Sequence, residues 1–207
     1  MSRAHPAQKP PQPGQDLSTF PSERKRPTRS YRAHAKIRGV GYFASDSGGR
    51  FNLSAPRGTN YFADDVYTAV RERLGELVSD GQAIFEEDAD EMVITAVGLP
   101  RPAAYANVTH KDAANHHVTR EMCAGDDYPV YQEWAAAFDA AGFAGVRYAS
   151  RFTTDPGPNS WAQFGPAGAD MTLIEQPEQG LDGVAACEEA KVTVLRRAPK
   201  SEFTILP

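Results

Sequence analysis

Glu72 is the acidic residue whose neighbours in the sequence best suit it to chemistry. Helical spacing places Thr68, Gly75 and Glu76 along the same face as Glu72. The small Thr68 and Gly75 leave room for another molecule to approach the Glu72 carboxylate, which can stabilise a positive charge beside it. By spacing alone, the ordinary interpretation is a solvated surface glutamate.

Ser150 is the second residue of interest, because it lies in a segment that alternates with a period of two. If Gly145–Arg151 is a strand, Ser150 shares a face with Val146 and Tyr148, and its hydroxyl can hydrogen-bond a ligand. No general base adjoins Ser150 in the sequence, so we predict that it positions a ligand rather than attacking one.

Arg32 and Arg50 can bind phosphate groups, because a guanidinium donates two parallel hydrogen bonds to phosphate oxygens. Surface arginines are the alternative interpretation. The chain has no GxSxG nucleophile elbow, no P-loop and no GxGxxG fingerprint. A dinucleotide would therefore be held without a Rossmann domain.

A metal site is disfavoured, although three histidines lie close together in the sequence. His110 and His116 do not share a helix face, and the adjacent His116 and His117 point in different directions. No HExxH motif or Cys/His quartet accompanies them, so we expect surface histidines and no functional metal.

The elements that must position these residues are short. One helix is predicted after Asp64 or Asp65, either of which can cap it, and its apolar stripe is expected to face the core: Val66, Val70, Leu74, Leu77 and Val78. A second helix begins near residues 127–129 and stops at Gly142.

Strands are predicted at residues 30–37, 58–63, 92–97, 145–151, 160–165, 191–195 and 203–206. The strands outnumber the helices and do not alternate with them regularly. We therefore predict an α+β fold of short mixed strands with flanking helices.

The composition bounds the rest. Residues 1–28 are rich in Pro, Gln, Lys and Ser, and we predict a disordered arm that docks through Leu17 and Phe20, with residues 29–207 as one folded domain. The net charge of −5, without a basic stripe, argues against direct nucleic-acid binding. Two cysteines without CxxC spacing and the absence of a long apolar stretch predict a cytoplasmic protein with no membrane association.

Blocks of sequence in a fixed order carry a family resemblance. They are Arg32 in SYRAH, then residues 48–53 (GGRFNL), 58–63 (GTNYFA), 69–75 (AVRERLG) and 145–151 (GVRYASR), supported by 119–121, 128, 134–135, 140–143 and 164–165. Together they resemble the RES family over roughly residues 30–168. The sequence departs from many relatives at Phe51, where they have Trp, and in the Pro/Gly-rich segment 153–159.

The resemblance implies an ADP-ribosyltransferase-like fold, with NAD as substrate rather than as a bound cofactor. Arg32, Glu72 and Ser150 match the Arg, Glu and Ser for which the family is named. Relatives look like toxins of toxin–antitoxin pairs that degrade NAD by phosphorolysis or hydrolysis. By the same analogy, a helix-turn-helix antitoxin is the expected protein partner.

The resemblance also suggests how the residues would divide the work. Arg32 and Arg50 would anchor the dinucleotide or an attacking phosphate, with Asn52 as a further substrate-binding residue. Tyr61 would stack on nicotinamide, and the alternative is that its ring packs in the core. Glu72 would stabilise the oxocarbenium-like ribose.

Three functions stay open on the sequence alone. The first is an NAD phosphorylase or glycohydrolase, and the second is a transferase that attaches ADP-ribose to a macromolecule. The third is a catalytically silent interaction module of the same fold. The sequence does not separate phosphate from water as the acceptor, nor a monomer from a homo-oligomer.

Overall fold

The computed structural model describes residues 8–24, 29–98, 103–175 and 177–197. Its strands are β1 (Ser22–Glu23), β2 (Ser30–Ala35), β3 (Tyr42–Phe43), β4 (Arg57–Ala63), β5 (Ile84–Phe85), β6 (Met92–Val97), β7 (Tyr105–Asn107), β8 (Gly145–Tyr148), β9 (Ser160–Pro166), β10 (Gly168–Ala169), β11 (Leu181–Asp182) and β12 (Val194–Leu195). Its helices are α1 (Val66–Leu74), α2 (Glu76–Ser79), α3 (Glu86–Asp90), the 3-10 helix η1 (Lys111–His116), α4 (Glu121–Ala124), α5 (Tyr128–Ala140) and α6 (Gly183–Glu189).

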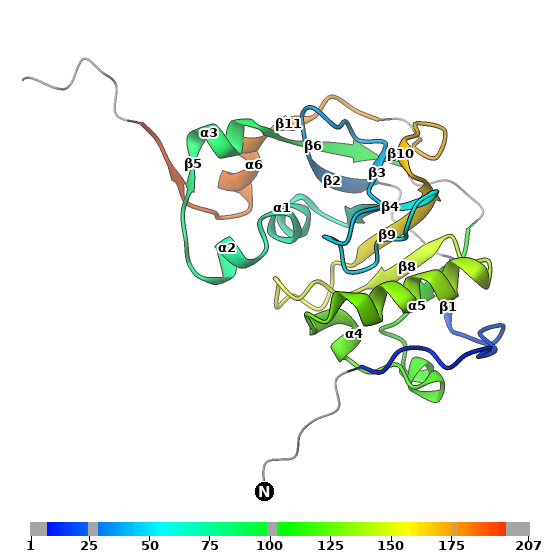
Figure 1. The fold of residues 1–207 in the computed structure, drawn as a ribbon. Helices are drawn as coiled ribbons and strands as arrows, with labels where there is room; N and C mark the ends of the chain where they lie inside the picture. Colours follow the sequence, from blue (N-terminus) through cyan, green and yellow to red (C-terminus); the bar gives the residue numbers. More distant parts are fainter. Residues whose placement is uncertain (1–7, 25–28, 99–102, 176, 198–207) are drawn as a thin grey trace, which may run out of the picture.

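A mixed sheet of eight strands, in the order β1-β7-β8-β9-β4-β2-β6-β11, organises the molecule (Figure 1). All neighbours in it are antiparallel except β7 and β8, which run parallel. Helix α5 covers the β8 end of the sheet, and α1 lies toward the β2 and β6 end. This confirms the predicted α+β class with short strands and flanking helices.

The sheet register decides which side chains share a face. Ala63 pairs with Tyr31 on one side and with Ser160 on the other, and Ser160 pairs in turn with Tyr148. Directly paired residues of antiparallel strands point to the same face, so Tyr31 and Tyr148 share one. Arg32, the next residue after Tyr31, leaves the sheet on the opposite face.

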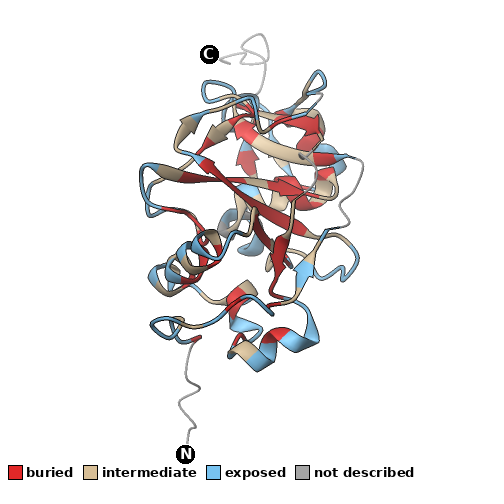
Figure 2. Cartoon of the chain, turned by 90° about the vertical axis from the view of Figure 1, so that its right-hand side faces the viewer, coloured by how far each residue is buried: buried red, intermediate tan, exposed pale blue. Residues whose placement is uncertain are grey.

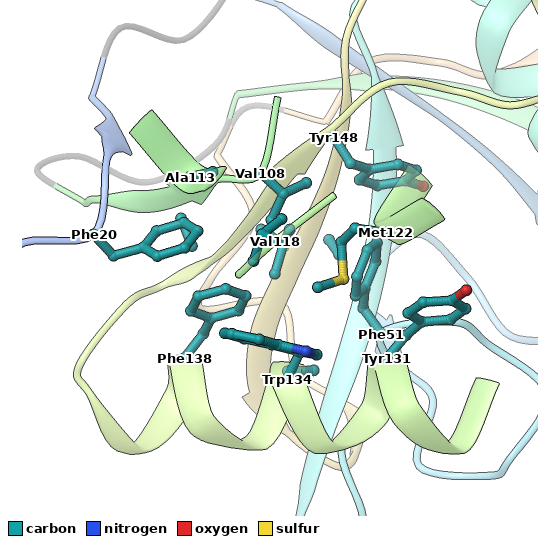
Figure 3. Packing of buried hydrophobic residues seen from close by; sticks show 14 of the residues in the cluster. Phe20, Phe51, Val108, Ala113, Val118, Met122, Tyr131, Trp134, Phe138 and Tyr148 are labelled. Atoms are coloured by element: carbon teal, nitrogen blue, oxygen red, sulfur yellow. The ribbon is translucent and has the colours of Figure 1, made fainter. Parts of the chain in front are cut away.

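Two hydrophobic clusters cover the face that carries Tyr148, and Figure 3 shows residues of the first of them. Figure 2 shows that buried residues run along the strands of the sheet. The first cluster lies under α5 and is built around Trp134 and Phe138, and the second lies under α1 and α6 around Val70 and Cys187. A third cluster, with Phe62 and Trp161 of β4 and β9, covers the opposite face. The helices α1 and α5 therefore lie on the same face of the sheet, and we call the boundary between their two clusters the seam.

Helix α1 forms and ends as its sequence dictates. Asp65 accepts a hydrogen bond from the Thr68 N–H at 2.7 Å and so caps the first turn. Gly75 ends the helix at φ 49°, in the region that favours glycine. Because α2 starts after this break, Leu77 is 46% exposed, and the prediction that it faces the core is wrong.

Residues 8–24 correct the prediction of a disordered arm for the part of it that the structure describes. The Trp134 indole donates to the Lys9 carbonyl at 2.8 Å, and Gln8 bonds both Thr119 and His117. The predicted docking residues Leu17 and Phe20 are each 4% exposed in the first cluster. Prolines and polar residues still order here because their backbone and amide groups find partners on the domain.

Several boundaries differ from those predicted. The helices α3 and α6 have no predicted counterpart, and the β8 strand stops at Tyr148, before Ser150. The helix α5 begins at Tyr128, within the predicted range, with Pro129 in its first turn and no side-chain cap from Asp127. The predicted strand 203–206 lies outside the described residues. Among the described residues, no helix has the length and apolar character needed to cross a membrane.

Candidate active site

Glu72 projects from α1 across the seam and is held by two hydroxyl groups. Tyr148 donates its phenolic hydrogen to Oε2 at 2.8 Å, and Ser150 donates its hydroxyl hydrogen to Oε1 at 2.5 Å. Hydroxyl bonds to a carboxylate are charge-assisted and correspondingly strong. The carboxylate is therefore held from both oxygens rather than freely rotating in solvent, as a surface glutamate would be.

Ser150 is itself oriented by the backbone. The Phe152 N–H donates to Ser150 Oγ at 3.1 Å, which leaves the serine hydrogen free to point at Glu72. Ser150 is 8% exposed, and within the described part of the chain the base that its hydroxyl contacts is the Glu72 carboxylate. The structure thus brings Glu72 and Ser150 together, with the serine hydroxyl directed at the carboxylate.

Asp64 anchors the segment that follows Ser150. Its Oδ2 accepts from the backbone and side-chain nitrogens of Asn159, at 2.9 and 2.7 Å, and its Oδ1 accepts from the Trp161 indole at 2.6 Å. Because Asp64 immediately precedes the α1 cap, these bonds tie the start of the Glu72 helix to the end of the loop that begins at Ser150. The spacing between Glu72 and Ser150 is fixed from both sides.

Tyr61 lies on the same sheet face as the Glu72 site and has its hydroxyl engaged. The hydroxyl accepts from the Phe51 N–H and donates to Asn52 Oδ1, both at 2.9 Å. Burial, more than any neighbouring charge, raises the pKa of the Tyr61 phenol. Tyr61 packs at the edge of the first cluster, so its ring is fixed in place with the phenol protonated.

Asn52 positions Tyr61 and is 4% exposed. Besides accepting from Tyr61, its amide donates to the carbonyl of Asp46 at 3.0 Å and to the Asp46 carboxylate at 3.2 Å. The amide hydrogen-bonding groups of Asn52 thus have partners within the protein. This arrangement supports a role in holding Tyr61 better than the predicted direct contact with substrate.

Arg50 is buried, at 9% exposure. Its guanidinium donates to the carbonyls of Met122 and Cys123, and its charge lies 5.5 Å from the centre of the Tyr131 ring and 5.9 Å from that of Tyr128. Stacking between aromatic rings suits a guanidinium better than an ammonium. Arg50 therefore supplies a fixed positive charge that acts, as the charge of Glu72 does, on the hydroxyl groups of Tyr61 and Tyr148.

Arg32 does not join this group. Register turns it to the opposite sheet face, where it donates to the Val40 carbonyl, an oxygen that also accepts from Asn60. Burial, with smaller effects from Arg73 and Arg38, lowers the pKa of Arg32 to about 9. The structure therefore brings Glu72 and Ser150 together but places Arg32 on the other face, because a shift of one residue along a strand reverses the direction of the side chain.

Tyr148 is the residue that sequence reasoning missed. Its signal was present, since it lies two positions before Ser150 on the face already assigned to that serine. Without the fold, however, a tyrosine on a buried strand is indistinguishable from core packing. Only the position of α1 shows that its hydroxyl meets a carboxylate.

Two surface hollows flank α5, one bordered by residues 11–18 and the other by Asn52, Arg57 and Gln132. Glu72 borders neither of them. Among the described residues, no group of three or more His, Cys, Asp or Glu side chains is arranged to hold a metal ion. His110 instead accepts from the Asp112 N–H at its own helix start, at 3.2 Å.

The fold and the site together define an α+β domain in which the Glu72 carboxylate is held by two hydroxyl groups at the seam between α1 and α5. The chain belongs to the RES domain family, whose model matches residues 23–182. The fold is similar to that of a chain in the crystal structure of the M. tuberculosis MbcT–MbcA toxin–antitoxin complex, with a TM-score of 0.58 and 17% identity. That match covers 84% of this chain and 91% of the other. No curated protein matches the sequence.

Proposed function

We propose that this protein is an enzyme that breaks the bond between nicotinamide and ribose in NAD and transfers ADP-ribose to phosphate or water. The observation that carries the proposal is the Glu72 carboxylate, oriented by Tyr148 and Ser150. Membership of the RES domain family supports NAD as the substrate. NAD is a substrate in this proposal, and no metal is required.

The reaction needs a negative charge held beside the ribose, and the oriented Glu72 carboxylate can supply it. When the carbon–nitrogen bond breaks, its electron pair goes to the pyridinium nitrogen, which leaves as neutral nicotinamide. The ribose carbon becomes an oxocarbenium-like cation, and a carboxylate beside it lowers the barrier. An oxygen of phosphate or water then forms the new bond, and with water one proton is released.

The remaining predicted residues fit supporting roles in this reaction. Arg50 carries a fixed charge that suits the NAD pyrophosphate or an incoming phosphate. Tyr61 presents a fixed aromatic ring on which nicotinamide could stack. Arg32, on the other sheet face, supports the fold through Val40 in our proposal and would act on substrate only indirectly.

Nicotinamide release from NAD by the purified full-length protein tests the proposal, with and without phosphate. We expect release, with ADP-ribose 1″-phosphate as the second product for phosphorolysis or ADP-ribose for hydrolysis. Glu72→Gln should reduce kcat about 10²–10³-fold, whereas Glu189→Gln, at an exposed glutamate of α6, should leave it unchanged. Absence of both nicotinamide release and NAD binding would refute the proposal.

Labelled NAD separates the transferase alternative in the same assay. Label that stays in small products supports phosphorolysis or hydrolysis. Label that appears on protein or nucleic acid, in a reaction supplemented with a cell extract, would replace our proposal with transfer to a macromolecule.

We further propose that the protein acts on cytoplasmic NAD as the toxin of a toxin–antitoxin pair. The structural neighbour, which comes from a toxin–antitoxin complex, is the support for this. Expression of the chain alone should arrest growth and deplete NAD, and co-expression of the product of its adjacent gene should restore growth. If Glu72→Gln arrests growth as strongly as the unaltered protein does, toxicity by NAD loss is excluded.

A further inference from the structure

We infer that Tyr148 is a positioning residue for Glu72: its hydroxyl fixes the carboxylate plane in the orientation that faces the developing sugar cation. The inference rests on the proposed function and adds to it a residue that neither the sequence analysis nor the family match assigns. Its basis is the 2.8 Å hydrogen bond from the Tyr148 hydroxyl to Glu72 Oε2.

Two donors are needed to fix a carboxylate. A single bond from Ser150 to Oε1 leaves the group able to turn about the bond that joins it to the side chain. The second bond, from Tyr148 to Oε2, removes that freedom, because the two donors reach opposite oxygens. Each oxygen retains accepting capacity, so the bracing does not block a cation from approaching.

Tyr148 is a rigid donor. It is 4% exposed and contacts the Phe51 ring edge-on, with the ring centres 5.1 Å apart (Figure 3). The strand β8 holds its backbone against Ser160. Its aromatic ring therefore has little freedom, and the position of its hydroxyl is set by the first cluster rather than by Glu72.

The hydroxyl also keeps its hydrogen. Burial, followed by the negative charge of Glu72, raises the pKa of Tyr148 well above its ordinary value. Tyr148 consequently donates throughout the neutral range, where an ionised phenol would repel the carboxylate. Because Glu72 belongs to the helix of the second cluster and Tyr148 to the first, their bond also joins the two sides of the seam.

Tyr148→Phe tests the inference, because it keeps the ring and removes only the donor. Bracing matters most when charge develops, so we expect kcat to fall about tenfold or more while KM for NAD changes by less than about twofold. Tyr105→Phe, at a fully buried tyrosine of the third cluster on the other sheet face, is the matched control and should retain normal kcat.

A double-mutant cycle separates positioning from general loss of structure. If Tyr148 acts through Glu72, the effect of Tyr148→Phe should largely vanish when it is added to Glu72→Gln, since no charged carboxylate remains to be oriented. A structural defect would lower the residual rate of Glu72→Gln by the same factor as it lowers the parent's. The fraction of each variant able to bind NAD is measured alongside, so that kcat refers to folded sites.

The outcomes are distinct. A tenfold loss in the parent and little loss in the Glu72→Gln background support the inference. A kcat for Tyr148→Phe within twofold of the parent, or equal losses in both backgrounds, overturns it while leaving the proposed function intact. An unaltered protein that neither binds NAD nor releases nicotinamide from it overturns the proposed function itself, and this inference with it.

Discussion

Ser150 donates a hydrogen bond to Glu72 across 2.5 Å, although 78 residues separate the two in sequence. The serine is oriented from behind by the Phe152 N–H, and the glutamate is also bonded by Tyr148. The bond places a neutral donor, and not an activated nucleophile, beside the acid. Ser150 therefore controls the position of Glu72 and does not attack substrate in the chemistry we propose.

Replacing Ser150 should slow the reaction without preventing folding. Ser150→Ala removes one of the two donors to Glu72, and we expect kcat for nicotinamide release to fall about 10–100-fold. Ser150→Thr keeps a hydroxyl and should recover part of the loss. Ser54→Ala, at an exposed serine, is the control. Equal activity of Ser150→Ala and the parent would remove the serine from the mechanism.

Arg50 should affect substrate binding more than turnover. Arg50→Lys keeps the charge but loses the planar group that lies over the rings of Tyr128 and Tyr131. We expect KM for NAD to rise about tenfold, equivalent to about 1.4 kcal/mol of binding free energy, with kcat nearly unchanged. Steady-state kinetics measures both, with Arg120→Lys at an exposed position as the control. An unchanged KM would contradict the anchoring role.

His34 should make folding stability fall as the solution becomes acidic. It is 7% exposed, and burial lowers its pKa, with a smaller lowering by the charge of Arg32. In the unfolded chain histidine titrates near pH 6.5, so below about that value the unfolded state binds more protons than the folded one. Stability is thus fully present above about pH 6.5 and is lost as pH falls toward the folded pKa.

Denaturant unfolding at about pH 7.5 and about pH 5.5 measures this loss, which cannot exceed about 1.4 kcal/mol per pH unit for one histidine. His34→Gln lacks the titrating ring and should show a smaller decrease in the free energy of unfolding than the parent. His110→Gln, at an exposed histidine, should behave like the parent. If His34→Gln loses as much stability on acidification as the parent, other groups cause the effect.

Phe20 should contribute as a core residue does. Its ring lies 4.8 Å from that of Phe138 and is buried in the first cluster. We expect Phe20→Ala to lower the free energy of unfolding by about 3 kcal/mol, the range for a buried aromatic. Ser18→Ala, two residues earlier and exposed, should change it little. A loss below about 1 kcal/mol for Phe20→Ala would mean that residues 8–24 do not share the core of the domain.

The sequence by itself determined the parts that depend on near neighbours. The Asp65 cap, the Gly75 break and the stripe of Val66 and Val70 specify α1 locally, because a helix repeats over a few residues. The strand β8, which carries Tyr148, was also predicted, although it ends before Ser150 rather than after it. The chemical types of Glu72 and Ser150, with the order of the blocks around them, indicated the family that the later match shows.

Only the tertiary structure decided which of these residues meet. The bonds of Glu72 with Tyr148 and Ser150 join α1 to β8 and the loop after it, and no local periodicity encodes such a distance. The register of β2 against β4 places Arg32 on the sheet face opposite Tyr148. Alternation within a single strand does not decide which of its two faces meets the site. Helical and strand patterns act over a few residues, whereas register and packing are set by the whole sheet.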